Sequence, residues 1–241
     1  MPGLDFDTTT DSVDVGDAPL DDTFVGGGTI MARIVADSFG HGTNFGRIID
    51  KASTTGAALG WAFQLDDPDT LRFEYGWTTT NGNWVTTPTT PINTGTEYHV
   101  ALSYNDGAVG NNPSIYVDGV LQALTEPSTP AGSAESDAAQ TLAIGNIVAS
   151  AYNRGFDGRI FDVRCYSRIL TAAEILDICL LPYPYVPDLV AHWEFAEGAV
   201  GTSPSGSNSV KDLANGQSDG TPNSTPVYFP VIIGPTRRRA S

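Results

Sequence analysis

The sequence has little positive charge and few cysteines. Its 241 residues include 12 Lys and Arg against 28 Asp and Glu, which gives a formal net charge of −16. A body this acidic repels nucleic acid phosphates and anionic lipid, so neither is expected as a partner. Two cysteines are too few for a disulfide scaffold. No apolar run approaches the roughly 20 residues that span a bilayer, so we expect no membrane-spanning segment.

The N-terminal segment lacks the features of an export signal. The first residues, MPGLDFD, contain no basic region and no long apolar stretch, whereas a secretory signal needs both. We therefore expect synthesis in a reducing cytoplasm without Sec export.

Glycine and proline are abundant, with 26 and 16 residues, and only 17% of residues are charged. This composition favours short strands joined by turns over a helical bundle. Asp118-Gly119 lies between two apolar stretches and predicts a tight two-residue hairpin. Asn81-Gly82 predicts a second hairpin for the same reason.

One helix is predicted. Thr171 and Glu174 have the spacing of a capping box. Apolar residues follow as far as Pro182, so we expect a helix over 172–180. Many short strands with one short helix predict an all-β fold, an antiparallel jelly-roll β-sandwich.

Several segments resemble the laminin-G-like, concanavalin A-like family. The stretch 155–175, GFDGRIFDVRCYSRILTAAEI, is similar to the family's turn, strand and capped helical turn. The segments 98–104 (YHVALSY), 115–119 (IYVDG) and 141–145 (TLAIG) look like family strands in the family's order. The resemblance covers nearly all of 1–180 and implies the lectin-like or glucanase-like sandwich.

The C-terminal part resembles the opening of the same family, although it comes last. The segment 189–198, LVAHWEFAEG, is similar to the family's first strand. We interpret this order as a circular permutation, which sandwich folds tolerate when their termini lie close together. The predicted organisation is a main body over 1–181, a proline-rich linker over 182–187, permuted strands over 188–233 and a basic tail over 234–241. The permuted strands complete the same sandwich or are exchanged with a neighbouring subunit.

No catalytic motif is present. A retaining glycosidase needs two carboxylates about 5 Å apart, and the alternating pattern Glu-x-Asp-x-x-Glu that would place them on one strand is absent. His41, His99 and His192 are isolated, and no paired-cysteine spacing exists, so no zinc site is expected. We predict a protein that is not an enzyme and needs no cofactor.

Calcium is the one metal for which the family resemblance makes a case. Relatives hold a structural Ca²⁺ with an Asp two residues before the position of Val163, but this sequence has Phe161 there. Three loop carboxylates, Asp157, Asp212 and Asp219, could still hold the ion, because Ca²⁺ accepts flexible oxygen cages.

Cys165 lies in an expected strand. Alternation places Phe161, Val163 and Cys165 on one face. We expect Cys165 to be a buried free thiol rather than a partner of Cys179.

Four residues could contact a sugar. Trp77 and Trp84 flank the predicted turn at Asn81, and Tyr152 and Asn153 precede a predicted strand. The alternative for the two tryptophans is packing across a hairpin.

The main functional hypothesis is a non-enzymatic virion structural protein. A solitary domain, the missing export signal, the permuted order and the basic tail suggest a tailed-phage capsid decoration or fibre component. It would be made in the host cytoplasm and reside in the virion as a homo-oligomer, bound to the major capsid protein or other virion proteins. The alternative is a lectin-like carbohydrate-binding module, and a glycoside hydrolase has the least support.

The C-terminal arm is the expected docking segment. Its apolar strand could add to a neighbouring sheet through backbone hydrogen bonds, and its arginines could engage acidic groups. The residues concerned are Val227, Phe229, Val231, Arg237, Arg238 and Arg239. The alternative is that 227–233 completes its own sandwich.

Overall fold

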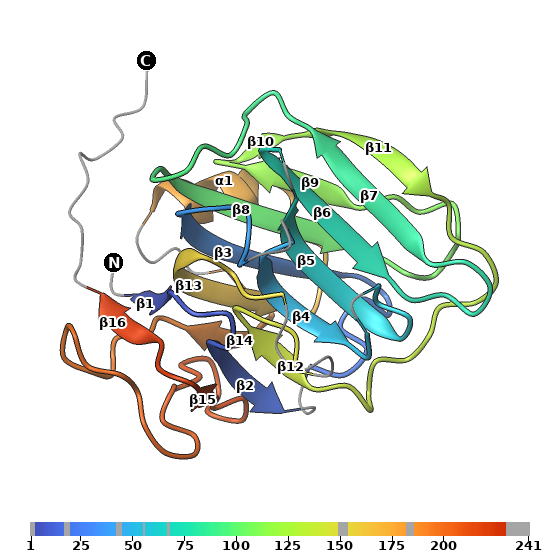
Figure 1. The fold of residues 1–241 in the computed structure, drawn as a ribbon. Helices are drawn as coiled ribbons and strands as arrows, with labels where there is room; N and C mark the ends of the chain where they lie inside the picture. Colours follow the sequence, from blue (N-terminus) through green and yellow to red (C-terminus); the bar gives the residue numbers. More distant parts are fainter. Residues whose placement is uncertain are drawn as a thin grey trace.

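Two antiparallel sheets face each other, and one helix lies outside them (Figure 1). The computed structural model describes residues 3–16, 20–41, 45–54, 56–66, 68–148, 154–181 and 186–229. Strands of two packed sheets turn alternate side chains toward the common core. The predicted all-β antiparallel sandwich with one short helix is confirmed.

The first sheet, sheet A, has eight strands in the described part of the chain. From one edge to the other it runs through β10 (Val120–Leu121), β9 (Ser114–Val117), β8 (Glu97–Tyr104), β3 (Gly28–Ala36), β13 (Gly158–Tyr166), β1 (Gly3–Phe6) and β16 (Val227–Phe229), with β14 (Leu189–Trp193) also paired to β13. The two ends of the described chain therefore lie on neighbouring strands of one sheet.

The second sheet, sheet B, has eight strands over the same ranges. It runs through β11 (Ala123–Ser128), β7 (Gly82–Thr87), β6 (Thr70–Tyr75), β5 (Gly60–Asp66), β4 (Arg47–Ala52), β12 (Leu142–Ile144), β2 (Ser12–Gly16) and β15 (Thr221–Asn223). The C-terminal segment thus contributes strands to both sheets.

Aromatic and branched side chains fill the space between the sheets. In β6, buried Leu71, Phe73 and Tyr75 alternate with half-buried residues, as a strand of period two requires. The Phe24 ring lies at the centre of an aromatic cluster, with its centroid 5.4 Å from those of Trp61 and Phe73. Each large apolar side chain buried in this way contributes about 1.5–3 kcal/mol to the free energy of unfolding, so this cluster is a main source of stability.

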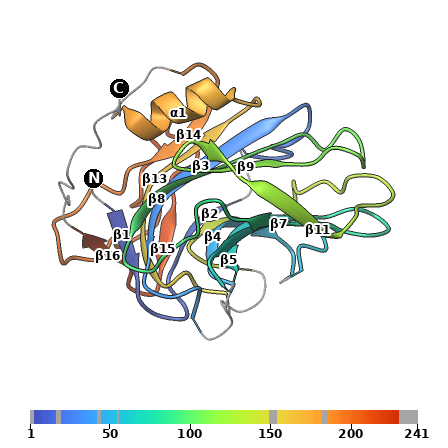
Figure 2. The same cartoon turned by 90° about the horizontal axis from the view of Figure 1, so that it is seen from above.

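The single described helix, α1 (Ala172–Leu180), lies on the outer side of sheet A (Figure 2). It begins at the predicted capping box: the Glu174 amide donates to Thr171 Oγ1 at 3.3 Å, and the Thr171 amide donates to Glu174 Oε2 at 2.8 Å. Ile175 and Ile178 are buried against the sheet in a cluster that includes Met31. The predicted helix over 172–180 is confirmed, and no helix in the described ranges is long and apolar enough to cross a membrane.

The described C-terminal residues pair with strands of the body in the same chain. Strand β14 pairs with β13, β15 with β2, and β16 with β1. The outer edge of β16 is also occupied, because the Tyr228 amide donates to Thr202 O at 2.8 Å and the Gly201 amide donates to Tyr228 O at 2.9 Å. The division into body, linker, permuted strands and tail stays a prediction.

Strand β13 is interrupted by a bulge. Its register shifts between Phe161 and Arg164, and Asp162 has a φ of 47°, in the left-handed region. As a result Ile160, rather than Phe161, lies in the central core with Val163 and Cys165. The predicted face of this strand is wrong at Phe161, because the extra residue changes the alternation.

Cys165 is a buried free cysteine. Burial raises the pKa of the Cys165 thiol above its usual range. The predicted buried free thiol is confirmed.

The two predicted hairpins have different outcomes. Asp118 and Gly119 have φ values of 51° and 76° and join β9 to β10, as a two-residue turn with two left-handed positions requires. The predicted tight turn at Asn81-Gly82 is wrong, because Gly82 already pairs with Tyr75 and a longer loop precedes it. That loop forms bridges with 131–134 instead.

Candidate functional site

The two tryptophans predicted to contact sugar are core residues. Trp77 is 5% exposed and Trp84 is 1% exposed. The Trp84 ring stacks on Phe73 with centroids 5.8 Å apart, and its indole N–H donates to Asn112 Oδ1 at 2.9 Å. A ring whose faces are covered by protein cannot stack on a ligand, so the prediction is wrong for both. For Trp84 the structure agrees with the alternative, because its ring packs on Phe73 across the β6–β7 pair.

Asp212 and Asp219, two of the predicted calcium ligands, organise a loop. The carboxylate of Asp212 accepts hydrogen bonds from the amides of His192 at 2.9 Å and Ala214 at 2.9 Å. Asp219 accepts from the Asp212 amide at 2.9 Å and from Lys211 Nζ at 2.6 Å. Their oxygens are therefore used by amides and a lysine.

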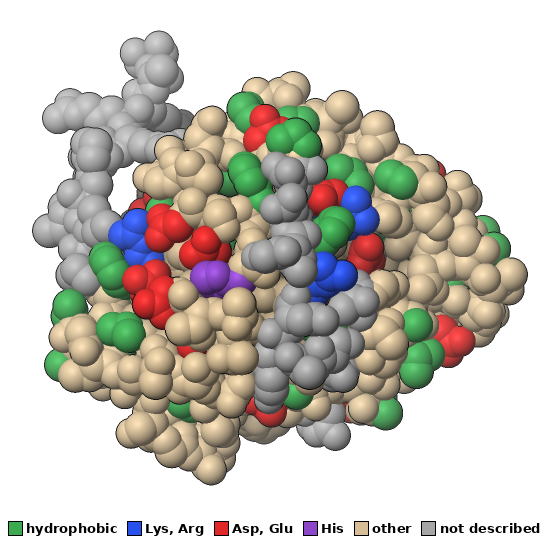
Figure 3. Space-filling view, viewed as in Figure 1, with side chains coloured by type: hydrophobic (Ala, Val, Ile, Leu, Met, Phe, Trp, Pro, Cys, Tyr) green, Lys and Arg blue, Asp and Glu red, His purple; other side chains and the backbone are tan. Residues whose placement is uncertain are grey.

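Asp157, the third predicted calcium ligand, lies elsewhere, with its Oδ1 3.6 Å from His41 Nε2. Acidic side chains gather around one histidine on the face shown in Figure 3. Burial raises the pKa of the nearby Asp5 to about 6, the positive charge of Arg159 opposes this shift, and the charge of Asp37 adds to it. Among the described residues, no group of three or more metal-binding side chains is arranged around a common point.

The predicted docking strand is part of the sandwich edge. Val227 and Phe229 are half buried in β16, and the Arg159 guanidinium lies 4.6 Å from the centre of the Phe229 ring. The remaining predicted residues lie outside the described residues; they are Tyr152, Asn153, Val231, Arg237, Arg238 and Arg239.

The structure has a surface cavity that the sequence did not predict, with a volume of about 470 Å³. It lies at one end of sheet A, where β8 ends and β9 begins. We call it the rim pocket. Its lining residues are Ser103, Tyr104, Asn105, Gly110, Asn111, Asn112, Ser114 and Ile169.

Three asparagines shape the loop between β8 and β9. Asn105 Oδ1 accepts from the Gly107 amide at 2.8 Å, and Asn111 Nδ2 donates to Asn105 O at 3.0 Å. Asn112 Oδ1 accepts from the indole of Trp84, which anchors the loop to the aromatic core. Each amide therefore uses one of its two polar atoms to fix the loop.

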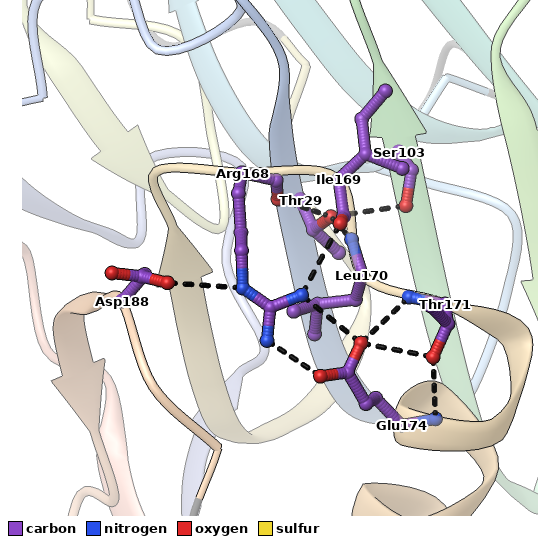
Figure 4. A network of polar contacts seen from close by, with 8 residues as sticks. All are labelled: Thr29, Ser103, Arg168, Ile169, Leu170, Thr171, Glu174 and Asp188. Atoms are coloured by element: carbon purple, nitrogen blue, oxygen red, sulfur yellow. Dashed lines mark hydrogen bonds and ion pairs between the residues drawn. The ribbon is translucent and has the colours of Figure 1, made fainter.

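Ile169 forms an apolar wall of the rim pocket, and a polar network holds its neighbours in the chain (Figure 4). The Leu170 amide donates to Thr29 Oγ1 at 2.9 Å, and Thr29 Oγ1 lies 2.8 Å from Arg168 O and 3.0 Å from Ser103 Oγ. These contacts tie the segment before α1 to β3 and β8. The wall that carries Ile169 is thus fixed before any ligand arrives.

Arg168 belongs to the same network and adds two carboxylates to it. Its Nη2 donates to Glu174 Oε1 at 2.6 Å, and its Nε donates to Asp188 Oδ2 at 3.1 Å (Figure 4). The side-chain hydrogen bond from Arg168 is the main cause that lowers the pKa of Glu174 to about 2. Glu174 therefore stays ionised and keeps this charge pair intact at neutral pH.

The lining of the rim pocket has no group for acid–base chemistry near neutral pH. Tyr104 is its one titratable side chain, and burial raises the pKa of that hydroxyl. Amide and hydroxyl groups both donate and accept hydrogen bonds. The pocket is suited to binding a ligand with many hydroxyl groups rather than to proton transfer.

A second polar cluster lies on the outer face of sheet B. We call it the ion network; its members are Arg47, Asp50, Asp66, Arg72 and Glu74. The guanidinium of Arg47 lies between two carboxylates, with Nε 3.1 Å from Asp50 Oδ2 and Nη1 3.7 Å from Glu74 Oε2. Burial raises the pKa of Asp50 to about 7. Asp50 is only 1% exposed, so a substrate does not reach this carboxyl group in the structure.

Two facing antiparallel sheets with one short helix outside them form a lectin-like, concanavalin A-like sandwich. The chain belongs to the concanavalin A-like lectin/glucanases superfamily, whose laminin-G family model matches residues 7–176. This result confirms the family resemblance of the sequence. No curated protein sequence matches the chain significantly.

Solved structures show the same fold at low sequence identity. A Bacteroides ovatus protein, to which carbohydrate binding is ascribed, has a TM-score of 0.62 and 22% identity over 94% of this chain and 61% of its own. A carbohydrate-binding module (CBM40) of a Ruminococcus gnavus sialidase, bound to α2,3-sialyllactose, has a TM-score of 0.54 and 13% identity over 74% of this chain and 98% of its own. A heptameric pentraxin of Limulus polyphemus has a TM-score of 0.51 and 15% identity over 74% of this chain and 81% of its own. The chain spans about three fifths of the Bacteroides protein.

Proposed function

We propose that this protein is a non-enzymatic carbohydrate-binding module and that the rim pocket binds the sugar. The observation that carries the proposal is the lining of the pocket, in which three asparagines and Ser114 lie beside the exposed apolar side chain of Ile169. Lectin-like relatives support it, since a module with this fold binds sialyllactose and the Bacteroides protein is ascribed carbohydrate binding. This was the alternative hypothesis from the sequence.

The asparagines have unused hydrogen-bonding capacity. Asn105 and Asn112 fix the loop through Oδ1, and in the described part of the chain no hydrogen bond is made by either Nδ2. Asn111 fixes it through Nδ2 and keeps Oδ1. A loop already held in place loses little conformational entropy when a ligand binds, so these groups are preorganised for sugar hydroxyls.

Catalysis of glycoside cleavage is disfavoured at this pocket. Retaining and inverting glycosidases both use a pair of carboxyl groups beside the scissile bond. No carboxyl group is among the lining residues of the rim pocket. The expected activity is therefore binding without turnover. The virion role, with its location, capsid partner and homo-oligomeric state, stays a prediction.

The test is a glycan array followed by calorimetry on the best neutral or acidic glycan. The variants Asn105→Asp and Asn112→Asp keep the Oδ1 acceptor that each loop contact needs, and they replace the Nδ2 donor with a negatively charged acceptor oxygen. We expect each to weaken binding about tenfold or more, the cost of a lost hydrogen bond plus an unpaired group.

The matched control is Asn208→Asp, which makes the same charge change on an exposed loop. It should bind as the unchanged protein does. If no glycan binds, or if all three variants bind equally well, the proposal is wrong.

A further inference from the structure

The rim pocket also carries information on the charge of its ligand. We infer that it selects uncharged sugars and rejects sugars that carry a carboxylate or sulfate group. The inference rests on the proposed function, because it concerns the ligand of the same pocket. Three observations support it: the lining, the state of the neighbouring arginine and the charges behind the pocket wall.

The lining offers no partner for an anion. Proteins bind carboxylate and sulfate groups tightly with arginine or lysine, and most tightly with the paired donors of a guanidinium. None of the described residues that line the pocket is an arginine, lysine or histidine. An acidic sugar would therefore lose the hydration of its charge without gaining an ion pair.

The arginine next to the pocket is already engaged. Arg168 directly precedes the wall residue Ile169, and all three of its guanidinium nitrogens have acceptors. Nη1 donates to Glu174 Oε2 at 3.0 Å, Nη2 to Glu174 Oε1 at 2.6 Å and Nε to Asp188 Oδ2 at 3.1 Å. Two carboxylates thus neutralise the charge of Arg168. If Arg168 turned to bind an anionic ligand, it would lose these contacts and break the network that positions Ile169 (Figure 4).

The acidic side chains near the pocket add a third argument. Beside the effect of burial, the negative charges of Asp106 and Glu126 raise the pKa of Tyr104, a lining residue. Asp106 follows the lining residue Asn105 in the chain and is 6% exposed, with its Oδ2 accepting from the Tyr75 hydroxyl at 2.7 Å. The net charge of −16 has the same sign. An anionic ligand is therefore repelled both at the wall and at long range.

Size and polarity agree with a neutral sugar. The volume of about 470 Å³ accommodates one or two sugar rings. Ile169 is 49% exposed and can cover the apolar face of a ring, while the asparagine amides of the lining meet the hydroxyl groups. Each of these contacts works without ionic groups.

The experiment compares matched pairs of probes that differ only in charge. Lactose and α2,3-sialyllactose are one pair, and on the array neutral glycans stand beside their sialylated, uronate-containing or sulfated counterparts. We expect the neutral member of a bound pair to bind at least about tenfold more tightly. Its affinity should be the same in low salt and in about 0.5 M NaCl, because no ion pair is screened.

A charge introduced into the pocket should reverse the selectivity. Ser114 lines the pocket at the start of β9, where its side chain is half buried. Ser114→Lys should gain salt-sensitive binding of the acidic member, and Ser114→Gln, of similar length and no charge, should not. Tighter binding of the acidic member by the unchanged protein overturns the inference but leaves the proposed function standing. Binding of neither member of any pair overturns both.

Discussion

The rim pocket and the ion network of sheet B use polar side chains in opposite ways. The ion network is charged, largely buried and paired within itself, so that Arg47 lies between Asp50 and Glu74. The rim pocket is uncharged, and its asparagines each spend one polar atom on the loop and keep the other. The charged side chains of the ion network bind one another and so stabilise the fold rather than a ligand. Each asparagine of the rim pocket fixes the loop with one polar atom and can bind a ligand with the other.

The largest effect should come from breaking the ion network. Arg47→Met removes a side chain that is 0% exposed and leaves two carboxylates without their shared partner. We expect the free energy of unfolding in urea to fall by about 3–5 kcal/mol, the usual cost of removing one member of a buried ion pair.

Arg72→Met is the matched control on the same face. The Arg72 side chain is 21% exposed, so water can solvate the groups it leaves behind. Its loss should be less than half that of Arg47→Met. Equal losses from the two variants would show that burial does not distinguish them.

The next effect concerns a buried histidine that belongs to neither region. His99 is 1% exposed, and both of its ring nitrogens lack a hydrogen-bond partner among the described residues. Burial, with a smaller effect from the positive charge of Arg33, lowers the pKa of His99 to about 3. Below its ordinary pKa of about 6.5 the unfolded chain takes up a proton that the folded chain does not, so acid favours unfolding.

His99→Phe removes this proton uptake. The ordinary pKa of the unfolded imidazole lies between about pH 5 and about pH 7.5. From the higher to the lower of these values, the unchanged protein should lose about 2 kcal/mol more of its unfolding free energy than the variant. Urea unfolding at the two pH values measures the difference. Parallel losses would mean that the ring is protonated in the folded state.

A smaller effect is expected at the support of the pocket wall. Glu174→Gln keeps the capping contacts to Thr171 but removes the charge that faces Arg168. Because the pair is partly exposed to solvent, the loss at pH 7 should be only about 0.5–1 kcal/mol. The pKa of Glu174 is lowered to about 2, so the loss is present above pH 4.5 and disappears as the pH falls through that lowered value. A thermal unfolding series from pH 7 downward tests this direction.

The smallest effect on stability should come from the pocket itself. Asn105→Asp and Asn112→Asp retain the acceptor that holds the loop, so each should change the unfolding free energy by no more than about 0.5 kcal/mol. The same variants should bind sugar poorly. A stability loss as large as that of Arg72→Met would place the pocket with the ion network, as structure rather than as a binding site.

Local signals in the sequence predicted local structure well. The capping box at Thr171 and the Asp118-Gly119 turn depend on residues that are neighbours in the chain, and both form as expected. The bulge at Asp162 could not be predicted in this way. It lies where β13 pairs with β3 on one side and β14 on the other, and β14 follows more than twenty residues later.

The candidate site could not be predicted from the sequence, for a related reason. The asparagines of the β8–β9 loop look like ordinary turn residues, because Asn is common wherever a chain reverses direction. Their role as a pocket depends on Ile169, which comes from a distant segment held by Thr29 and Ser103. The prediction for Trp77 and Trp84 was wrong because the sequence does not show which aromatic side chains face the core between the sheets.

The pairing of β1 with β16 has a mechanical consequence. Gly3 lies opposite Phe229 and Asp5 opposite Val227, so the two ends of the described chain leave the sheet side by side. A force that pulls residues 3 and 229 apart acts along the hydrogen bonds of this antiparallel pair and loads them one after another. The β1–β16 pair therefore separates at low force, while β13 stays hydrogen-bonded to its neighbours β3 and β14. Tethered by both ends, the molecule would yield first at this edge and keep the rim pocket, at the other side of sheet A, intact.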